Sequence, residues 1–457
     1  MYTMKVSAPL DPGFRPLEME VRAYEQDALA SGQAMDFGVL ILRNQGFCDH
    51  YQMKIFPDGK DARTVPLLDR LVKTLLWAWG GWKIVTFGSK EVHDHLKAAY
   101  QAGGERAFDA DFMATVYERP FEVEQADKLE DVLVTRSSAS TVGRHLNGCR
   151  IGFDAGGSDR KVSAVIDGEP VYSEEVVWFP KTNSDPQYHY DGILDAMKTA
   201  ASHMPRVDAI GVSSAGVYID NKVMVASLFL KVPKEDFNRR VKTMYMDVAK
   251  EIGAPIEVAN DGDVTALAGA MELNVGNVFG VAMGTSEAAG YVDSAMNITG
   301  WLNELAFAPV DANPASLSDE WSGDWGCGVK YFSQDSVIKL APAAGIALDE
   351  SLSPAEKLRI VQKEMVAGNP EAAKIYETIG VYFGYTLGWY SRFYDIDHVL
   401  IMGRVTSGDG GPIILQKAQE VLDKEFPALA AKAQLHIPDE KSRRVGQSVA
   451  AASLPQV

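Results

Sequence analysis

The sequence has 457 residues, of which 46% are hydrophobic, a formal net charge of -18 and an isoelectric point near 4.9. This length and apolar content suffice for two or three cored domains rather than one. The negative charge repels nucleic-acid backbones and anionic membranes, and it argues against either as a partner.

The cysteines and the N-terminal residues indicate the cellular compartment. Cys48, Cys149 and Cys327 are odd in number and widely spaced, which is typical of free or buried thiols in a reducing compartment. Residues 1–20 lack the basic, apolar and small-residue progression of a secretion signal, and no apolar run approaches the ~18 residues of a membrane span. We therefore expect a cytoplasmic protein.

The first 147 residues predict a small α/β region. Strands are expected over 37–43, 51–56 and 83–87, and helices over 65–79 and 90–100. The order strand, turn, strand, helix, strand recurs over 151–212, so this region could be a decayed copy of that half-domain. We favour the alternative, an unrelated α/β appendage that packs on a lobe or on another subunit. The sparse Lys and Arg disfavour a winged-helix DNA reader.

A connecting stretch is expected next, over 125–148. Its run Ser137-Ser138-Ala139-Ser140-Thr141 is typical of a domain boundary.

An apolar strand that ends in glycines gives the clearest chemical signal. Ile151-Gly152-Phe153 leads into Asp154-Ala155-Gly156-Gly157-Ser158. A tight glycine turn lets backbone N–H groups approach phosphate oxygens, and a carboxylate at a strand end can hold Mg²⁺ through water. The same residues also fit an ordinary hairpin turn, so this interpretation depends on the segments that follow.

A second acidic strand end lies further along the chain. The strand from Pro255 ends in Asn260-Asp261 and leads into a helix expected over 264–271. A carboxylate between a strand end and a helix N-terminus lies where α/β proteins place reactive groups. Asn-Asp before a helix is also typical of an Asx turn or an N-cap, and this alternative stays open.

Two further apolar strands end in glycine. The strand over 278–283 precedes Gly284-Thr285-Ser286. A strand expected over 398–405, which contains Gly403, follows a long helical segment over 371–394 and opens into Ser407-Gly408-Asp409-Gly410-Gly411. The chain thus presents a phosphate turn, an acidic strand end, a second phosphate turn and a glycine-rich strand end. This order is more specific than any single motif.

Residues 148–457 therefore resemble the ROK family of sugar kinases, within the actin and hexokinase superfamily of two-lobed phosphotransferases. Asp154 to Ser158 resembles the family's first phosphate motif and Gly284-Thr285-Ser286 the second. Ile210 to Val217 is similar to the strand and turn beside the sugar site, with Ala215 in place of proline. Asn260-Asp261 resembles the family's Asn-Asp pair, and Glu304-Leu305-Ala306-Phe307 its Glu-x-Gly-His segment.

The resemblance implies an architecture. It is an α/β, two-lobed actin/hexokinase-like (ribonuclease H-like) fold, with an additional N-terminal α/β domain over 1–147, a small lobe over 148–265 and a large lobe over 266–457. It also implies a homodimer formed through the larger lobe, a surface that the N-terminal addition could block or replace. The DNA-reading role of some relatives is disfavoured by the acidic charge.

The resemblance also implies roles for individual residues. Asp261 would be the general base, and the sugar would be bound by Asn260, Asp261, Glu304 and Gly216. Asp154 would orient Mg²⁺ through water. ATP would be held by Asp154, Gly156, Gly157, Ser158, Gly284, Thr285 and Gly403.

The chain departs from the family at the metal motif. Most relatives bind a structural zinc through a His and a Cys-x-Cys-Gly-x-x-Gly-Cys loop, but here Phe307 replaces the His and Cys327 alone remains. Tetrahedral zinc needs about four N or S ligands, so no structural zinc is expected. Trp321 and Trp325 in the same loop could stack on a sugar, although we favour a hydrophobic staple beneath the loop.

The phosphate turns also differ. Asp159 and Glu287 place acidic residues beside them, and Arg404 replaces a second glycine. We expect these carboxylates to repel a polyphosphate unless Mg²⁺, Arg160 or Lys161 offsets their charge.

Two functions remain open. The first is ATP-dependent phosphorylation of a sugar hydroxyl. The second is a catalytically silent sugar- or nucleotide-sensing protein on the same fold, which the missing zinc motif and altered glycines would suit. Asp154 and Asp261 favour the enzyme, because a binding module needs no base.

Overall fold

The computed structural model describes residues 2–137, 142–438 and 440–457, so residues 138–141 of the connecting stretch predicted over 125–148 lie outside the described residues. Packing divides the chain into two compact units. The first comprises Met1–Ser138, Val281–Ala289 and Gly300–Ile437, and the second comprises Ala139–Gly280, Gly290–Thr299 and Pro438–Val457. Residues 1–138 thus share a unit with most of the predicted large lobe, and the three predicted domain ranges stay predictions.

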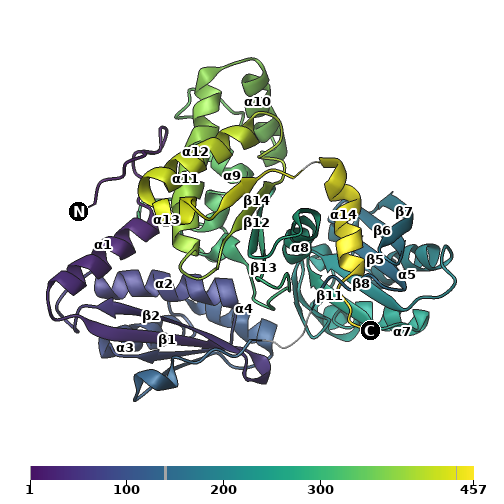
Figure 1. Ribbon diagram of the computed structural model, residues 1–457, viewed down its shortest axis with the longest axis horizontal. Helices are drawn as coiled ribbons and strands as arrows, with labels where there is room; N and C mark the ends of the chain where they lie inside the picture. The colour runs from purple at the N-terminus through teal and green to yellow at the C-terminus, as the bar shows by residue number, and fades with distance from the viewer. Residues whose placement is uncertain (1, 138–141, 439) are drawn as a thin grey trace. The chain divides into compact units, whose positions relative to one another are not determined.

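The first unit begins with a sheet of order β2-β1-β3-β4. Its strands are β1 (Met35–Leu42), β2 (Cys48–Ile55), β3 (Lys83–Phe87) and β4 (Glu122–Gln125). Its helices are α1 (Leu17–Ala30), α2 (Thr64–Trp79), α3 (Lys90–Ala99) and α4 (Ala107–Tyr117). Helix α1 packs on β2 and α2 on β1, as Figure 1 shows. The predicted strands and helices of this region are confirmed to within a few residues.

Strand direction shows that this sheet is not a copy of the sheet in the second unit. β1 runs antiparallel to β3. In the second unit β5 (Cys149–Ala155) runs parallel to β8 (Ala209–Ser214), because a third strand precedes the helix that leads to β8. The interpretation of residues 1–147 as a decayed half-domain is therefore wrong. The recurring order of elements misled because it does not encode strand direction.

The rest of the first unit surrounds the sheet β13-β12-β14-β15. Its strands are β12 (Val278–Met283), β13 (Glu287–Val292), β14 (His398–Met402) and β15 (Gln434–His436), and β12 and β13 continue into residues of the second unit. The helices are α9 (Gln334–Leu340), α10 (Pro354–Val366), α11 (Pro370–Tyr390), α12 (Gly410–Glu425) and α13 (Pro427–Ala430). Gly380 and Gly384 let α11 approach α12, since a Cβ on either would lie 2.6 Å from an α12 atom.

The second unit is built on the sheet β11-β8-β5-β6-β7. Besides β5 and β8, the strands of this unit are β6 (Asp159–Ile166), β7 (Glu169–Val177), β9 (Val217–Ile219), β10 (Lys222–Val225) and β11 (Ile256–Asn260). Its main helices are α5 (Pro186–Ala201), α7 (Met244–Ile252), α8 (Asp261–Leu273) and α14 (Glu440–Ala452). Helix α14 lies so close to the sheet that a Cβ at Gly152 or Gly211 would collide with its backbone.

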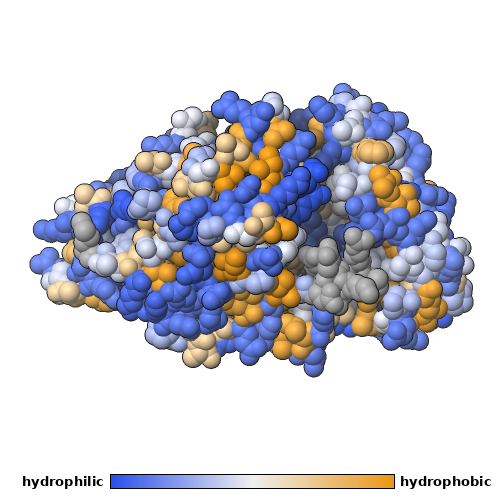
Figure 2. Space-filling view, turned by 90° about the horizontal axis from the view of Figure 1, so that it is seen from above, coloured by the Kyte–Doolittle hydropathy of each residue, from blue (hydrophilic) through white to orange (hydrophobic). Residues whose placement is uncertain are grey.

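The surface in Figure 2 is largely hydrophilic, with hydrophobic residues in scattered groups. This suits the net charge of -18. Among the described residues, no helix combines the length and apolar character that crossing a bilayer requires.

Candidate functional site

The carboxyl edge of the sheet in the second unit gathers four residues predicted from the sequence. Strands β5, β8 and β11 are parallel and adjacent, with Asp154 opposite Ser213 and Asn260 opposite Ser214. Parallel strands present their carboxyl ends at one edge, where α/β proteins bind ligands. Asp154, Gly216, Asn260 and Asp261 therefore lie along this edge.

The first phosphate turn, Gly156-Gly157-Ser158, joins β5 to β6. Trp178 supports it, because its indole Nε1 donates to the carbonyl of Gly156 at 2.8 Å and its backbone N donates to that of Ser158 at 3.1 Å. Lys181 covers the turn, and a Cβ at Gly157 would lie 2.9 Å from Lys181 Nζ. Among the described side chains, no carboxylate pairs with the exposed Lys181. A cation thus lies against the turn that is predicted to bind phosphate.

Neither cation named from the sequence is free for phosphate. Lys161 Nζ lies 3.0 Å from the carboxylate of Asp159 and 3.6 Å from that of Asp154. Arg160 donates to the carbonyl of Gly192 and pairs with Asp195 at 3.2 Å. Lys161 therefore offsets Asp159, as expected, but Lys181 is the cation placed to meet a phosphate.

Asp154 has the surroundings of a single carboxylate ligand. It accepts a hydrogen bond from Ser213 Oγ at 2.9 Å and faces Lys161. Burial raises its pKa, although Lys161 and Ser213 favour the charged form. Mg²⁺ that accompanies a nucleotide takes one or two carboxylates, phosphate oxygens and water. Asp154 fits that pattern, because each oxygen keeps acceptor capacity.

Asn260 has a structural role in addition to its predicted one. Its Oδ1 accepts from Gly262 N at 2.7 Å and caps α8, and its Nδ2 donates to the carbonyl of Gly216 at 2.7 Å. Gly216 has a φ of 132°, and a Cβ there would collide with the Val225 carbonyl. The N-cap interpretation of Asn260 is confirmed, while sugar binding by Asn260 and Gly216 stays a prediction.

Asp261 is the first residue of α8. Burial, and next the negative charge of Asp154, raise its pKa to about 6, although hydrogen bonds and Lys181 act in the opposite direction. A carboxylate with such a pKa is charged at neutral pH and is a stronger base than an ordinary aspartate. These are properties of a general base.

The first unit carries the other predicted phosphate residues. Gly403, with a φ of 101°, lies against the backbone of Met283, directly before Gly284. The two glycine turns are therefore adjacent. The Gly284 N–H donates to Ser286 O at 3.0 Å, so this N–H already has a partner within the turn. Phosphate binding by Gly284, Thr285 and Gly403 stays a prediction.

Glu287 is not the repulsive charge that the sequence suggested. Its side chain is only 4% exposed, and neither carboxyl oxygen has a hydrogen-bond partner. Burial, and next the charge of Glu304, raise its pKa to about 8. The carboxyl group is therefore mostly neutral at neutral pH, and it would not repel a polyphosphate.

Phe307 lies in an aromatic group contributed by the N-terminal region. Its ring centroid is 4.4 Å from that of Trp77 and 5.6 Å from that of Phe108. Cys327 is also buried, and its Sγ lies 3.8 Å from the carbonyl oxygen of Asp324. Among the described residues, no group of three or more His, Cys, Asp and Glu side chains could hold a metal ion.

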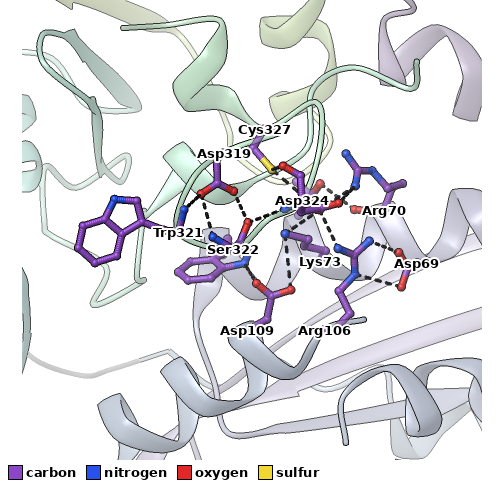
Figure 3. A network of polar contacts seen from close by, with 12 residues as sticks. Asp69, Arg70, Lys73, Arg106, Asp109, Asp319, Trp321, Ser322, Asp324 and Cys327 are labelled. Carbon is purple, nitrogen blue, oxygen red and sulfur yellow. Dashed lines mark hydrogen bonds and ion pairs between the residues drawn. The ribbon is translucent and has the colours of Figure 1, made fainter. Parts of the chain in front are cut away.

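The loop that carries Trp321 and Trp325 is held by the N-terminal region as well. Asp324 accepts from Arg70 at 2.8 and 2.7 Å and from Lys73 at 2.7 Å, and Arg106 pairs with it at 2.7 Å (Figure 3). Arg70 also stacks on the Trp325 ring at 3.9 Å. Trp321 is 68% exposed and points away from this network. The predicted hydrophobic staple is therefore wrong, because buried ion pairs hold the loop.

Sequence reasoning missed Lys181, Trp178 and the cations that surround Asp324. Lys181 lies in a short 3₁₀ helix, Pro180–Thr182, and no spacing in the sequence links it to the glycine turn. The buried cations had one available signal, since the charged residues Asp69, Arg70 and Lys73 interrupt a largely apolar helix that is buried almost throughout.

Known proteins were compared with this chain. No protein-family model and no curated protein matches the sequence. The ROK hexokinase from Thermus thermophilus matches in structure at 16% sequence identity and a TM-score of 0.52, over 66% of this chain and 97% of that one. The chain has the ROK fold.

The ROK fold confirms the predicted α/β, two-lobed actin/hexokinase-like class. A ROK family transcriptional regulator, a homologue of the E. coli MLC protein, matches at 16% identity and a TM-score of 0.51, over 68% of this chain and 79% of that one. Because a hexokinase and a regulator both have the ROK fold, the fold alone does not choose between these functions.

Proposed function

We propose that this protein transfers the γ-phosphoryl group of ATP to a hydroxyl group of a sugar, as a cytoplasmic enzyme. One observation carries the proposal: the half-buried carboxylate of Asp261, with its raised pKa, shares a sheet edge with the phosphate turn that Lys181 covers. A base and a cation beside a glycine turn are what phosphoryl transfer to an alcohol requires.

One bond forms and one bond breaks at the γ-phosphorus. Asp261 takes the proton of the sugar hydroxyl as that oxygen attacks the γ-phosphorus, the bond to the bridging β–γ oxygen breaks, and ADP leaves. Lys181 and the N–H groups of the Gly156–Ser158 turn stabilise negative charge on the phosphates. Mg²⁺, held through water by Asp154, would neutralise phosphate charge when bound. Glu304 would orient the sugar.

A sugar- or nucleotide-sensing protein is the second candidate. Lys161 faces Asp154, so a resident cation already offsets the carboxylate expected to orient Mg²⁺. The resemblance in structure to a ROK regulator also suits this role. In that case the protein would bind its ligands without turnover.

The test is ADP release from Mg·ATP across hexoses, N-acetylhexosamines and polyols, with Asp261→Asn beside the wild type. We expect sugar-dependent turnover that falls roughly 10²- to 10⁴-fold in the variant. Asp236→Asn is the matched control, because this residue lies elsewhere in the second unit and pairs with Arg239. A folded wild type that binds sugars but never releases ADP would favour the sensor.

A further inference from the structure

The N-terminal region holds the segment that carries Glu304 through its backbone. Helix α2 ends at Trp79, and the last carbonyls of a helix have no partner within it. Here the N–H groups of residues 302, 303 and 304 donate to the carbonyls of residues 79, 78 and 77 at 3.3, 2.9 and 3.1 Å. The end of α2 therefore fixes the backbone on which Glu304 is mounted.

Side chains reinforce this attachment on both sides of Glu304. Asn303, which adopts a φ of 52°, accepts a hydrogen bond from Tyr394 at 2.9 Å. Phe307 packs on Trp77 of α2. Asparagine adopts this left-handed conformation more readily than other non-glycine residues do, so the turn at this position suits the sequence. The segment is thus held on several sides.

A second segment is tied to the first. Gly328 N donates to Ala308 O at 2.9 Å, and Val310 N donates to Gly326 O at 2.8 Å. The loop before Gly326 carries Asp324, which is clamped by Arg70 and Lys73 of α2 and by Arg106. The N-terminal region therefore holds the Glu304 segment directly and also through this loop.

Charges of both signs surround Asp324, and the half-buried His95 also contacts Asp69 at 3.2 Å. Three buried cations, Arg70, Lys73 and Arg106, meet three buried carboxylates, Asp69, Asp109 and Asp324 (Figure 3). Burial raises the pKa of Asp324, but the three cations outweigh this effect and hold the pKa well below its usual range. Removing one partner of a buried pair leaves an uncompensated charge, so the cluster is sensitive to single substitutions.

We propose that α2 and Arg106 position Glu304 for the acceptor, and that Asp324 attaches the neighbouring loop to them. The N-terminal region then supports a segment that binds the acceptor, rather than being an appendage. Arg70, Lys73, Trp77 and Arg106 are positioning residues. This inference rests on the proposed function, because it takes Glu304 as a sugar-binding residue.

The test uses the full chain with Asp324→Asn, and with Phe307→Leu as a milder change that adds no buried charge. Hydrogen exchange, followed by mass spectrometry, reports on residues 302–310, and calorimetry reports on binding of the best sugar from the panel. For Asp324→Asn we expect exchange over 302–310 to quicken about tenfold and the sugar dissociation constant to rise about tenfold or more. ATP affinity should change less than about twofold. Phe307→Leu should show the same pattern at about threefold.

The controls separate positioning from general damage. Asp324→Glu keeps the charge and should restore most of the sugar affinity. Lys90→Ala removes an exposed ion pair with Asp94 on α3 of the same region and should change nothing. The proposal is overturned if folded Asp324→Asn keeps wild-type exchange over 302–310, or if sugar and ATP affinity fall equally. Since the exchange test needs no turnover, failure of the proposed reaction would be seen separately.

Discussion

The phosphate turn of the second unit and the Glu304 segment of the first are held in different ways. Gly156–Ser158 is held by residues close in sequence, with Trp178 and Lys181 in the connection that follows β7. The Glu304 segment is held by residues 77–79 and by a loop fastened to Arg70, Lys73 and Arg106. A turn supported by residues nearby in sequence tolerates changes elsewhere in the chain, whereas the Glu304 segment depends on residues far away in the sequence.

After substitution of Asp261, the largest effect is expected from substitution of Lys181, which lies against the phosphate turn. Lys181→Ala should lower kcat roughly 10²-fold, because a cation that meets developing phosphate charge is lost. Lys181→Arg should retain most activity. Lys198→Ala, which removes an exposed lysine paired with Glu251 in the same unit, is the control. Equal activities of Lys181→Ala and Lys198→Ala would exclude Lys181 from the site.

The pH dependence of kcat/KM tests the base beside that turn. Because the pKa of Asp261 is raised to about 6, the rate should fall about tenfold per pH unit below pH 6 and level off above it. In Lys181→Ala this acidic limb should move to higher pH, since Lys181 helps to lower that pKa. A profile that is flat from pH 5 to 8 would contradict the assignment of Asp261.

Glu287 offers a stability test in the first unit. Its pKa rises from 4.5 to about 8 on folding, so the folded state holds this proton more tightly than the unfolded state does. Stability should therefore fall as pH rises from about 5 to 8, by roughly 1 kcal/mol per pH unit relative to Glu287→Gln. Urea unfolding of both proteins at several pH values measures the difference, and parallel curves would contradict it.

The smallest expected effect concerns Trp321. This side chain is 68% exposed, whereas Trp325 is covered by Arg70. Trp321→Ala should therefore change sugar affinity less than about twofold, as is usual for surface substitutions. A tenfold loss would instead support stacking of the indole on a sugar ring.

The sequence predicted the strands better than the side-chain contacts that hold segments together. The strands that end at Asp154, Asn260 and Gly284 were predicted because apolar runs followed by glycine or acidic residues are local signals. The clamp on Asp324 was not predicted, because Arg70 and Asp324 lie far apart in sequence and only packing brings them together. Charges were also misjudged: Glu287 was taken as ionised, but burial keeps it mostly neutral.

The close packing of α14 on the sheet affects how the chain folds during synthesis. Gly152 of β5 and Gly211 of β8 touch the backbone of this helix, and Arg150 donates to the carbonyl of Pro455 at 2.8 Å. During synthesis β5 leaves the ribosome long before α14 does, so the face of the sheet that α14 covers stays open to water meanwhile. The sheet that carries Asp154 and the Gly156–Ser158 turn is therefore covered on this face only after residues 440–452 have been made.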